Sequence, residues 1–164
     1  RYQEMKAKTE KLRAEQKAAE AANPILAEGR QYIRKIREAN DALPEEDISQ
    51  KLQQLETIIG KIFACVEQRP QKLPEIRRFL NYYLPTTLKL VTAYREFSEQ
   101  PVQGDNINNA KNTIKQTLDT VNDAFAKLLD GLYQDEVMDI SSDASVLESM
   151  LAQEGLTGGD FEKK

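Results

Sequence analysis

Apolar residues recur every three or four positions through most of this chain, and this spacing limits the fold more than any other feature. In two stretches the steps alternate between four and three without interruption. Such steps place all members of a stripe on one face of an α-helix, and no alternation typical of a β-strand is present. The two stripes consist of Ile48, Leu52, Leu55, Ile59, Ile62 and Val66, and of Ile76, Leu80, Tyr83, Thr87, Leu90, Tyr94 and Phe97.

Proline and acidic residues mark where several helices begin and end. Pro44 precedes three acidic residues, 45–47, and this order is typical of a helix start because carboxylates complement the positive end of the helix dipole. Pro70 and Pro74 bracket a connection that is short enough for only a tight turn. After a break rich in turn residues, Asp105 is expected to cap the next helix.

The two ends of the chain give weaker signals. Residues 2–22 are rich in good helix formers but poor in apolar residues, with no sustained heptad, which predicts an exposed helix. The pair 23–24, Asn-Pro, either opens a new helix or kinks a continuing one. Near the C-terminus, Ser141 or Ser142 is expected to cap a short last helix that Gly155 ends.

These segments predict an all-α fold: an antiparallel helical bundle of three to four long helices plus a short C-terminal helix, with an exposed N-terminal helix. A chain of 164 residues is long enough for one domain with a substantial core. We assign residues 1–23 to the exposed or projecting N-terminal helix, 24–156 to the helical bundle domain and 157–164 to a disordered tail.

Composition excludes several classes of site. The chain has no histidine, so the usual acid–base residue at neutral pH and the commonest metal ligand are both missing. No glycine-rich phosphate loop occurs, and Cys65 stands four residues from Arg69 in a helix pattern that cannot wrap a phosphate. Cys65 is expected beside the core. With an isoelectric point near 5.1 and no basic face interleaved with aromatic residues, the sequence predicts no nucleic-acid partner.

Carboxylates form two groups that could hold a hard cation. Asp119, Asp123 and Asp130 lie on roughly one helix face, as Mg²⁺ would require. That face is opposite the apolar stripe, so a solvated acidic surface is the simpler interpretation. The second group lacks the spacing of an EF-hand and consists of Asp135, Glu136, Asp139 and Asp143. We therefore predict no catalytic residue, no metal site and no cofactor.

Two basic groups are candidate binding surfaces. Arginine forks and hydroxyl groups along one helix face suit a phosphate or a carboxylate-bearing partner, and a solvated stripe is the alternative. The candidate ligand or partner surface consists of Arg77, Arg78, Tyr82, Thr86 and Lys89. The candidate basic face, which would attract anionic lipid, consists of Arg30, Arg34, Lys35 and Arg37.

Charge also differs between the two ends of the chain. Residues 1–43 carry ten Lys and Arg against seven Asp and Glu, whereas residues 101–164 carry five against twelve. The basic start and the acidic end either attract each other or face different partners, unless both are simply solvated helix faces.

A proline lies in the middle of the second apolar stripe, in the stretch RRFLNYYLPTTLKLV. Pro85 removes one backbone donor and crowds the preceding turn, which costs a regular helix about 3 kcal/mol or more. The apolar steps nevertheless continue across it, so we predict one kinked helix. Thr86 or Thr87 is expected to satisfy a carbonyl that the proline frees. Tyr83 and Thr87 are predicted in the core, with Tyr82 and Thr86 on the outer side.

Residues 67–91, EQRPQKLPEIRRFLNYYLPTTLKLV, resemble the signature of the 5-bromo-4-chloroindolyl phosphate hydrolysis proteins, the XpaC-like family. Three further segments are similar to this family in the same order: YIRKIREAN at 32–40, IKQTLDTVNDAFAKLLDGLYQD at 114–135 and MDISSDASVLESMLAQEGL at 138–156. The resemblance covers roughly residues 30–156, and residues 1–29 carry little of it.

The resemblance implies a helical bacterial protein in an arrangement anchored to the membrane, with a toxic-anion-resistance protein as a plausible partner. The chain begins at Arg1 rather than Met, which predicts a fragment whose N-terminus is missing. The resemblance then implies a cytoplasmic location, with a membrane anchor in the missing segment. The family name implies hydrolysis of a phosphate ester, but the resemblance supplies no catalytic residue.

Two functional hypotheses follow. The first is a non-catalytic helical interaction module at the cytoplasmic membrane face, which binds a protein partner or forms oligomers. The alternative is a weak metal-assisted phosphatase that uses Asp139, Asp143 or the face of Asp119 and Asp123, helped by Arg77 and Arg78.

Overall fold

The computed structural model describes residues 1–157, apart from the side chains of residues 19, 21 and 22, and its helices form two compact units. The first unit spans Arg1–Leu129 and the second begins at Asp130. The helices are α1 (Tyr2–Asp41), α2 (Glu46–Gln68), η1 (Pro70–Ile76), η2 (Phe79–Tyr83), α3 (Leu84–Ser98), α4 (Asp105–Gly131) and α5 (Gln134–Gln153). No strand occurs within the described residues, and the predicted all-α fold is confirmed.

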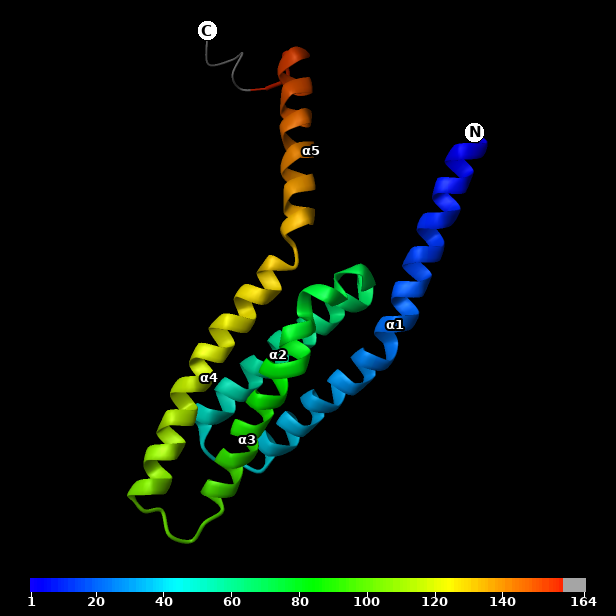
Figure 1. Ribbon diagram of the computed structural model, residues 1–164. Coiled ribbons are helices and arrows are strands. Elements are labelled where there is room, and N and C mark those ends of the chain that lie inside the picture. The colour runs from blue at the N-terminus through cyan, green and yellow to red at the C-terminus, as the bar shows by residue number, and fades with distance from the viewer. Residues whose placement is uncertain (158–164) are drawn as a thin grey trace. The chain divides into compact units, whose positions relative to one another are not determined.

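The first unit is an antiparallel bundle (Figure 1). The chain passes along α1, returns along α2, runs back through η1, η2 and α3, and returns again along α4. α1 packs against α2, η1 and α3. On α4, the Asn122 side-chain amide donates a hydrogen bond of 3.1 Å to the Lys51 carbonyl of α2. The bundle therefore has the architecture that the apolar steps predict.

α1 is one helix of 40 residues with Pro24 inside it. The pair 23–24 therefore continues a helix rather than opening a new one. Every residue from 1 to 17 is exposed, and among the side chains of α1 that the structure describes, the first buried one is Leu26. Figure 1 shows this first part of α1 running past the helices that cover the rest of it. The predicted exposed N-terminal helix is thus the free end of a longer one.

α2 is the central helix of the first unit, because its apolar stripe is completely buried. All six predicted members have no exposed surface, and Phe63 and Cys65 are 1% exposed. The Phe63 ring lies edge to face with Phe79, at 5.9 Å between centroids, and Phe79 meets Phe125 of α4 at 4.9 Å. These three aromatic rings connect α2, η2 and α4 through the core.

The helix that contains Pro85 passes through a π-helical turn, η2, directly before the proline. The Leu84 N–H donates to the Phe79 carbonyl, five residues back, so the backbone is wider than in an α-helix at the point where Pro85 would crowd the preceding turn. The Thr87 hydroxyl donates to the Tyr83 carbonyl at 2.6 Å. The predicted continuous helix is therefore correct, and its distortion is a π-turn.

The π-turn changes which residues face the core. The predicted stripe placed Tyr83 in the core, and this is wrong, because Tyr83 is 49% exposed. The π-turn inserts one extra residue, so the buried stripe takes a step of five from Phe79 to Leu84 and then resumes steps of three and four. The buried members are Ile76, Phe79, Leu84, Thr87, Val91 and Tyr94.

Two predicted boundaries are also corrected. The connection between Pro70 and Pro74 is not a bare turn but the 3₁₀-helix η1. α5 begins at Gln134, so neither serine at 141–142 caps it. Asp135 in the first turn of α5 complements the helix dipole and favours the earlier start.

The predicted end of α5 is confirmed. Gly155 adopts φ 71°, and the Leu156 N–H donates back to the Leu151 carbonyl at 2.9 Å. Beyond residue 157, the expected disordered tail lies outside the described residues, and the domain limits at 23 and 156 stay predictions.

Candidate functional site

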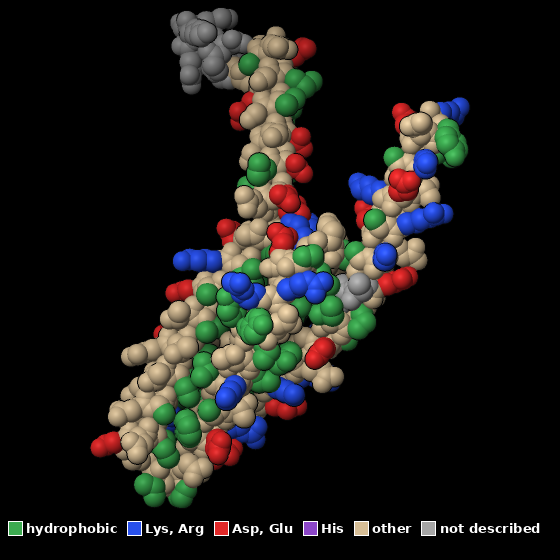
Figure 2. Space-filling model, in the orientation of Figure 1, with side chains coloured by type: hydrophobic (Ala, Val, Ile, Leu, Met, Phe, Trp, Pro, Cys, Tyr) green, Lys and Arg blue, Asp and Glu red, His purple; other side chains and the backbone are tan. Residues whose placement is uncertain are grey.

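A groove of about 500 Å³ runs between the α3 and α4 sides of the first unit. Its lining is mostly apolar, and its polar groups are hydroxyls of threonine and tyrosine. Figure 2 shows hydrophobic side chains gathered along this face. The lining residues are Tyr82, Tyr83, Thr86, Thr87 and Leu90 from η2 and α3, and Thr117, Thr120, Val121, Ala124, Phe125 and Leu128 from α4.

The π-turn builds one wall of this groove. Because of the extra residue in the turn, Tyr82 and Tyr83 both leave the core, and they are 66% and 49% exposed. Thr87 remains buried at the floor, with its hydroxyl bound to the Tyr83 carbonyl. Periodicity in the sequence does not identify Tyr83 and Thr87 as groove residues. The signal that could have found them is the proline inside an unbroken stripe, since a π-turn relieves that conflict.

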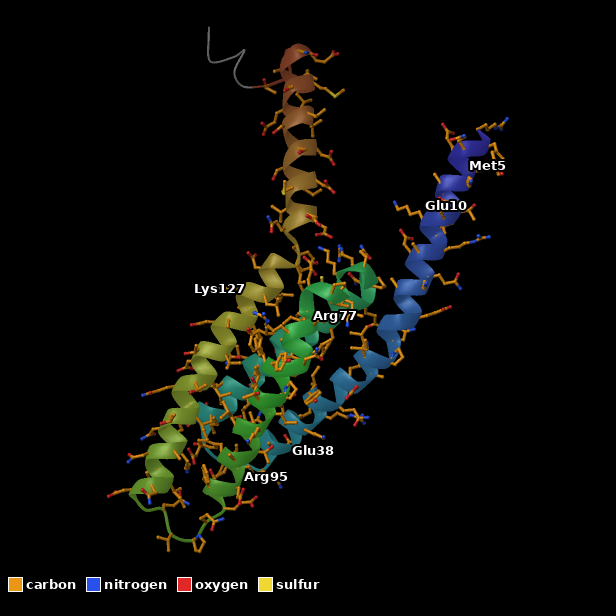
Figure 3. The ribbon with its side chains drawn as sticks, viewed as in Figure 1. Met5, Glu10, Glu38, Arg77, Arg95 and Lys127 are labelled. Carbon is orange, nitrogen blue, oxygen red and sulfur yellow. The ribbon has the colours of Figure 1, made fainter. Side chains whose placement is uncertain are left out.

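The residues of the candidate partner surface do not lie together in the structure. Tyr82 and Thr86 line the groove, whereas Arg77 lines a smaller pocket of about 140 Å³ with residues of α1 (Figure 3). Arg78 and Lys89 are exposed and line neither hollow. The five residues therefore do not converge on one ligand, and their role stays a prediction.

The candidate basic face is exposed but partly neutralised. Arg30 forms an ion pair with Glu67 of α2, and the Arg37 Nε atom lies 2.8 Å from Glu56 Oε1. Arg34 and Lys35 are exposed on α1 between these pairs. Two of the four cations are thus engaged within the bundle, which weakens the attraction of this face for anionic lipid.

The candidate carboxylates do not gather into a metal site. Asp119 accepts a hydrogen bond of 2.5 Å from the Lys51 ammonium, and Asp123 is exposed. Asp139 and Asp143 lie on α5 and are exposed. Within residues 1–157, no three acidic or cysteine side chains are close enough to share a metal ion.

A cluster of ionisable groups lies where the α1–α2 connection meets α3 and α4. Glu45 accepts a hydrogen bond of 2.7 Å from the buried Tyr94 hydroxyl and one of 3.1 Å from Lys111. Lys115 lies 3.4 Å from Glu45 and 2.9 Å from Asp47. Lys111 also lies 5.2 Å from the centre of the Tyr94 ring, close enough for a cation–π contact.

These contacts shift the pKa values of Glu45, Asp47, Tyr94 and Lys115. The Tyr94 hydrogen bond, with the two lysines, lowers the pKa of Glu45, and the Lys115 hydrogen bond lowers the pKa of Asp47. The Asp47 hydrogen bond raises the pKa of Lys115, and burial raises the pKa of Tyr94. All four shifts move away from neutrality, whereas an acid–base catalyst needs a pKa near the working pH. The cluster is suited to joining four segments of the bundle.

Comparison with models of protein families identifies the family of this chain. The family model of the 5-bromo-4-chloroindolyl phosphate hydrolysis proteins matches residues 2–147. The chain belongs to this family. No curated protein matches it, and no solved structure matches it. Within residues 1–157 of this family member, no helix has the combined length and hydrophobicity that crossing a bilayer requires.

The family description names a phosphate ester, and the groove can be compared with that chemistry. Hydrolysis of a phosphate ester commonly needs a nucleophile together with a metal ion or an acid–base partner. The groove lining supplies aliphatic and aromatic surface with neutral hydroxyls, and no carboxylate, amine, guanidinium or thiol. Such a surface is suited to binding by burial and by a few hydrogen bonds.

Proposed function

We propose that this family member is a non-catalytic helical interaction module that acts at the cytoplasmic membrane face, and that the α3–α4 groove binds its protein partner. The observation that carries the proposal is the groove itself, an open apolar hollow between two helices with exposed tyrosines on one wall.

The chemistry of the groove supports a peptide or helix as its occupant. An amphipathic helix commonly lies in an apolar groove and anchors there through side chains three, four and seven positions apart. Tyrosines such as Tyr82 and Tyr83 are frequent anchors of protein interfaces, because they bury a large ring and keep a hydroxyl for a hydrogen bond. Thr86, Thr117 and Thr120 offer further hydroxyls along the lining.

The choice of partner and location rests on the family. Members of this family resemble membrane-anchored proteins and are linked with toxic-anion-resistance proteins, so we propose such a protein as the partner. Arg34 and Lys35, the two cations of the candidate basic face outside its ion pairs with α2, would favour an anionic membrane surface modestly.

Binding to the purified toxic-anion-resistance protein of the same organism tests the proposal. Tyr82→Ala is expected to weaken the affinity about thirtyfold in titration calorimetry, because a buried anchor contributes about 2 kcal/mol. Gln116→Ala, on the exposed part of α4 outside the groove, is the matched control and should leave the affinity unchanged. Equal affinities for the two variants would refute the groove as the binding site.

A direct assay separates this function from the phosphatase alternative. The purified chain is incubated with 5-bromo-4-chloroindolyl phosphate and Mg²⁺ or Mn²⁺. We expect no turnover by the folded protein. Robust turnover that Asp119→Asn or Asp139→Asn abolishes would contradict a non-catalytic module.

A further inference from the structure

The apolar stripe of α1 extends beyond the helices that cover it. Leu26 is 3% exposed in the bundle, and Leu12 lies two heptads upstream on nearly the same face. Leu12 is 56% exposed, Met5 is 66% exposed and Tyr2 is 78% exposed. Met5 is labelled near the start of α1 in Figure 3. We call residues 2–17 the α1 arm. Its exposed apolar residues continue the face of α1 that packs in the bundle, and Leu12 also lines a shallow hollow with Glu67 and Pro70.

Basic side chains flank the stripe of the α1 arm. Tyr2, Met5 and Leu12 lie on one helix face, which they share with Thr9 and Gln16. Lys6 and Arg13 lie on one flank of this face, and Lys8 and Glu15 lie on the other. Residues 1–17 carry six Lys and Arg against three Asp and Glu, and all of them are exposed. The arm therefore presents exposed apolar side chains beside one basic edge and carries a net positive charge, with Lys and Arg side chains visible along it in Figure 2.

α5 also has an exposed apolar stripe, but its charged residues are acidic instead of basic. None of its residues is buried, yet its apolar residues follow steps of three and four over the length of the helix. Val137, Ile140 and Leu147 are 60%, 67% and 57% exposed. Residues 134–153 carry five Asp and Glu and no Lys or Arg. The stripe of α5 consists of Val137, Ile140, Ala144, Leu147 and Leu151.

The flanks of the α5 stripe carry the acidic residues that match the arm. Asp143 lies at the position before an apolar member and Glu148 at the position after one, on opposite edges. At these edge positions of a coiled coil, opposite charges on two helices favour their pairing and like charges disfavour it. Two α5 helices would bring acidic edges together, and two α1 arms would bring basic edges together.

We infer that the α1 arm of one copy packs against α5 of a second copy, through the two apolar stripes and the opposite charges on their edges. The arm of 16 residues is about 24 Å long and α5, of 20 residues, is about 30 Å long, so α5 is long enough to cover the whole arm. Each copy has one arm and one α5. A symmetric dimer makes two such contacts.

Sedimentation of the full chain at a series of concentrations tests the inference. A reversible dimer is expected, and it should weaken as salt is raised, because exposed charges on the edges are screened. Leu147→Asn is expected to weaken dimerisation at least tenfold. Val146→Asn is the matched control, since Val146 has a similar exposure of 59% but lies off the stripe. A chain that stays monomeric, or equal effects of the two variants, would overturn the inference.

A charge exchange identifies the helices that meet. Asp143→Lys with Glu148→Lys is expected to weaken the dimer, and so is Lys8→Glu with Arg13→Glu. Combining all four substitutions restores opposite edges and should recover most of the lost affinity. All four residues are exposed, so helical content measured by circular dichroism should not change. Failure of the combined variant to recover beyond either pair would count against this contact.

Discussion

Gly29 of α1 lies against the aromatic core of the first unit, and its replacement by alanine reports how tightly that core is packed. A Cβ atom at Gly29 would lie 2.4 Å from Phe63 Cζ and 2.7 Å from Phe63 Cε1. Carbon atoms do not approach so closely, so the Phe63 ring would have to move. The ring is 1% exposed and packs against Phe79, which in turn packs against Phe125.

Two opposite effects set the magnitude. Alanine is favoured over glycine inside a helix by about 1 kcal/mol. Overpacking a well-filled core costs about 1–3 kcal/mol, and the upper part of that range applies where the obstructing ring is fixed by further rings. We therefore expect Gly29→Ala to lower the free energy of unfolding by about 2 kcal/mol.

Urea unfolding followed by circular dichroism at 222 nm measures the change. Gly60→Ala is the matched control, because Gly60 is inside α2 and a Cβ atom there would meet nothing within 4 Å. It should raise the free energy of unfolding by about 0.5–1 kcal/mol.

A second variant tests the cause. In a Phe63→Leu background the side chain is smaller, and the cost of Gly29→Ala should largely disappear, as contact between the two sites requires. A Gly29→Ala protein as stable as the parent, or an undiminished cost in the Phe63→Leu background, would refute the reasoning.

Two other changes test the polar contacts of the bundle. Tyr94→Phe should destabilise the protein by about 1 kcal/mol at pH 7, since it removes the hydrogen bond to the partly exposed carboxylate of Glu45. Because the pKa of Glu45 is lowered from 4.5 in the folded protein, this stabilisation is complete above 4.5 and is lost as the pH falls through the folded value. Unfolding at pH 7 and pH 3 should therefore show a shrinking difference between the two proteins, and a constant difference would contradict the assignment. Thr87→Val should cost about 1 kcal/mol in urea unfolding by removing the part-buried hydrogen bond to the Tyr83 carbonyl, whereas Thr113→Val, which loses an exposed bond of the same kind, should cost less.

The stripe on α2 illustrates what local spacing can predict. Its six members were identified from steps of four and three, and each is fully buried. The steps correspond to the helical repeat, so burial of one member places the others on the same side of the helix. The end of α5 at Gly155 was predictable for a comparable reason, because its φ of 71° is one that glycine adopts without strain.

Residues around Pro85 mark the limit of that reasoning. Constant spacing assumes a constant helical repeat, and the π-turn at residues 79–83 breaks the assumption. One extra residue moves Tyr83 to the surface and brings Phe79 and Leu84 into the core. The groove follows from this shift, so its wall could not be located from periodicity.

Contacts between distant segments were equally inaccessible. Nothing in the local pattern pairs Glu45 with Tyr94 and Lys111, because those residues lie in different helices and meet only when the bundle closes. The same holds for Lys51, whose ammonium forms an ion pair with Asp119 of the acidic face.

The sequence by itself determined the all-α class, the position of most helices, the exposed start of α1 and the family. Each of these depends on interactions within a few turns of helix or on similarity along the chain. Only the tertiary structure determined where the groove lies, which residues line its walls, and which candidate site residues form ion pairs within the bundle. The physical reason is that these features arise where separate helices meet, and the widened turn before Pro85 sets which side chains reach that boundary.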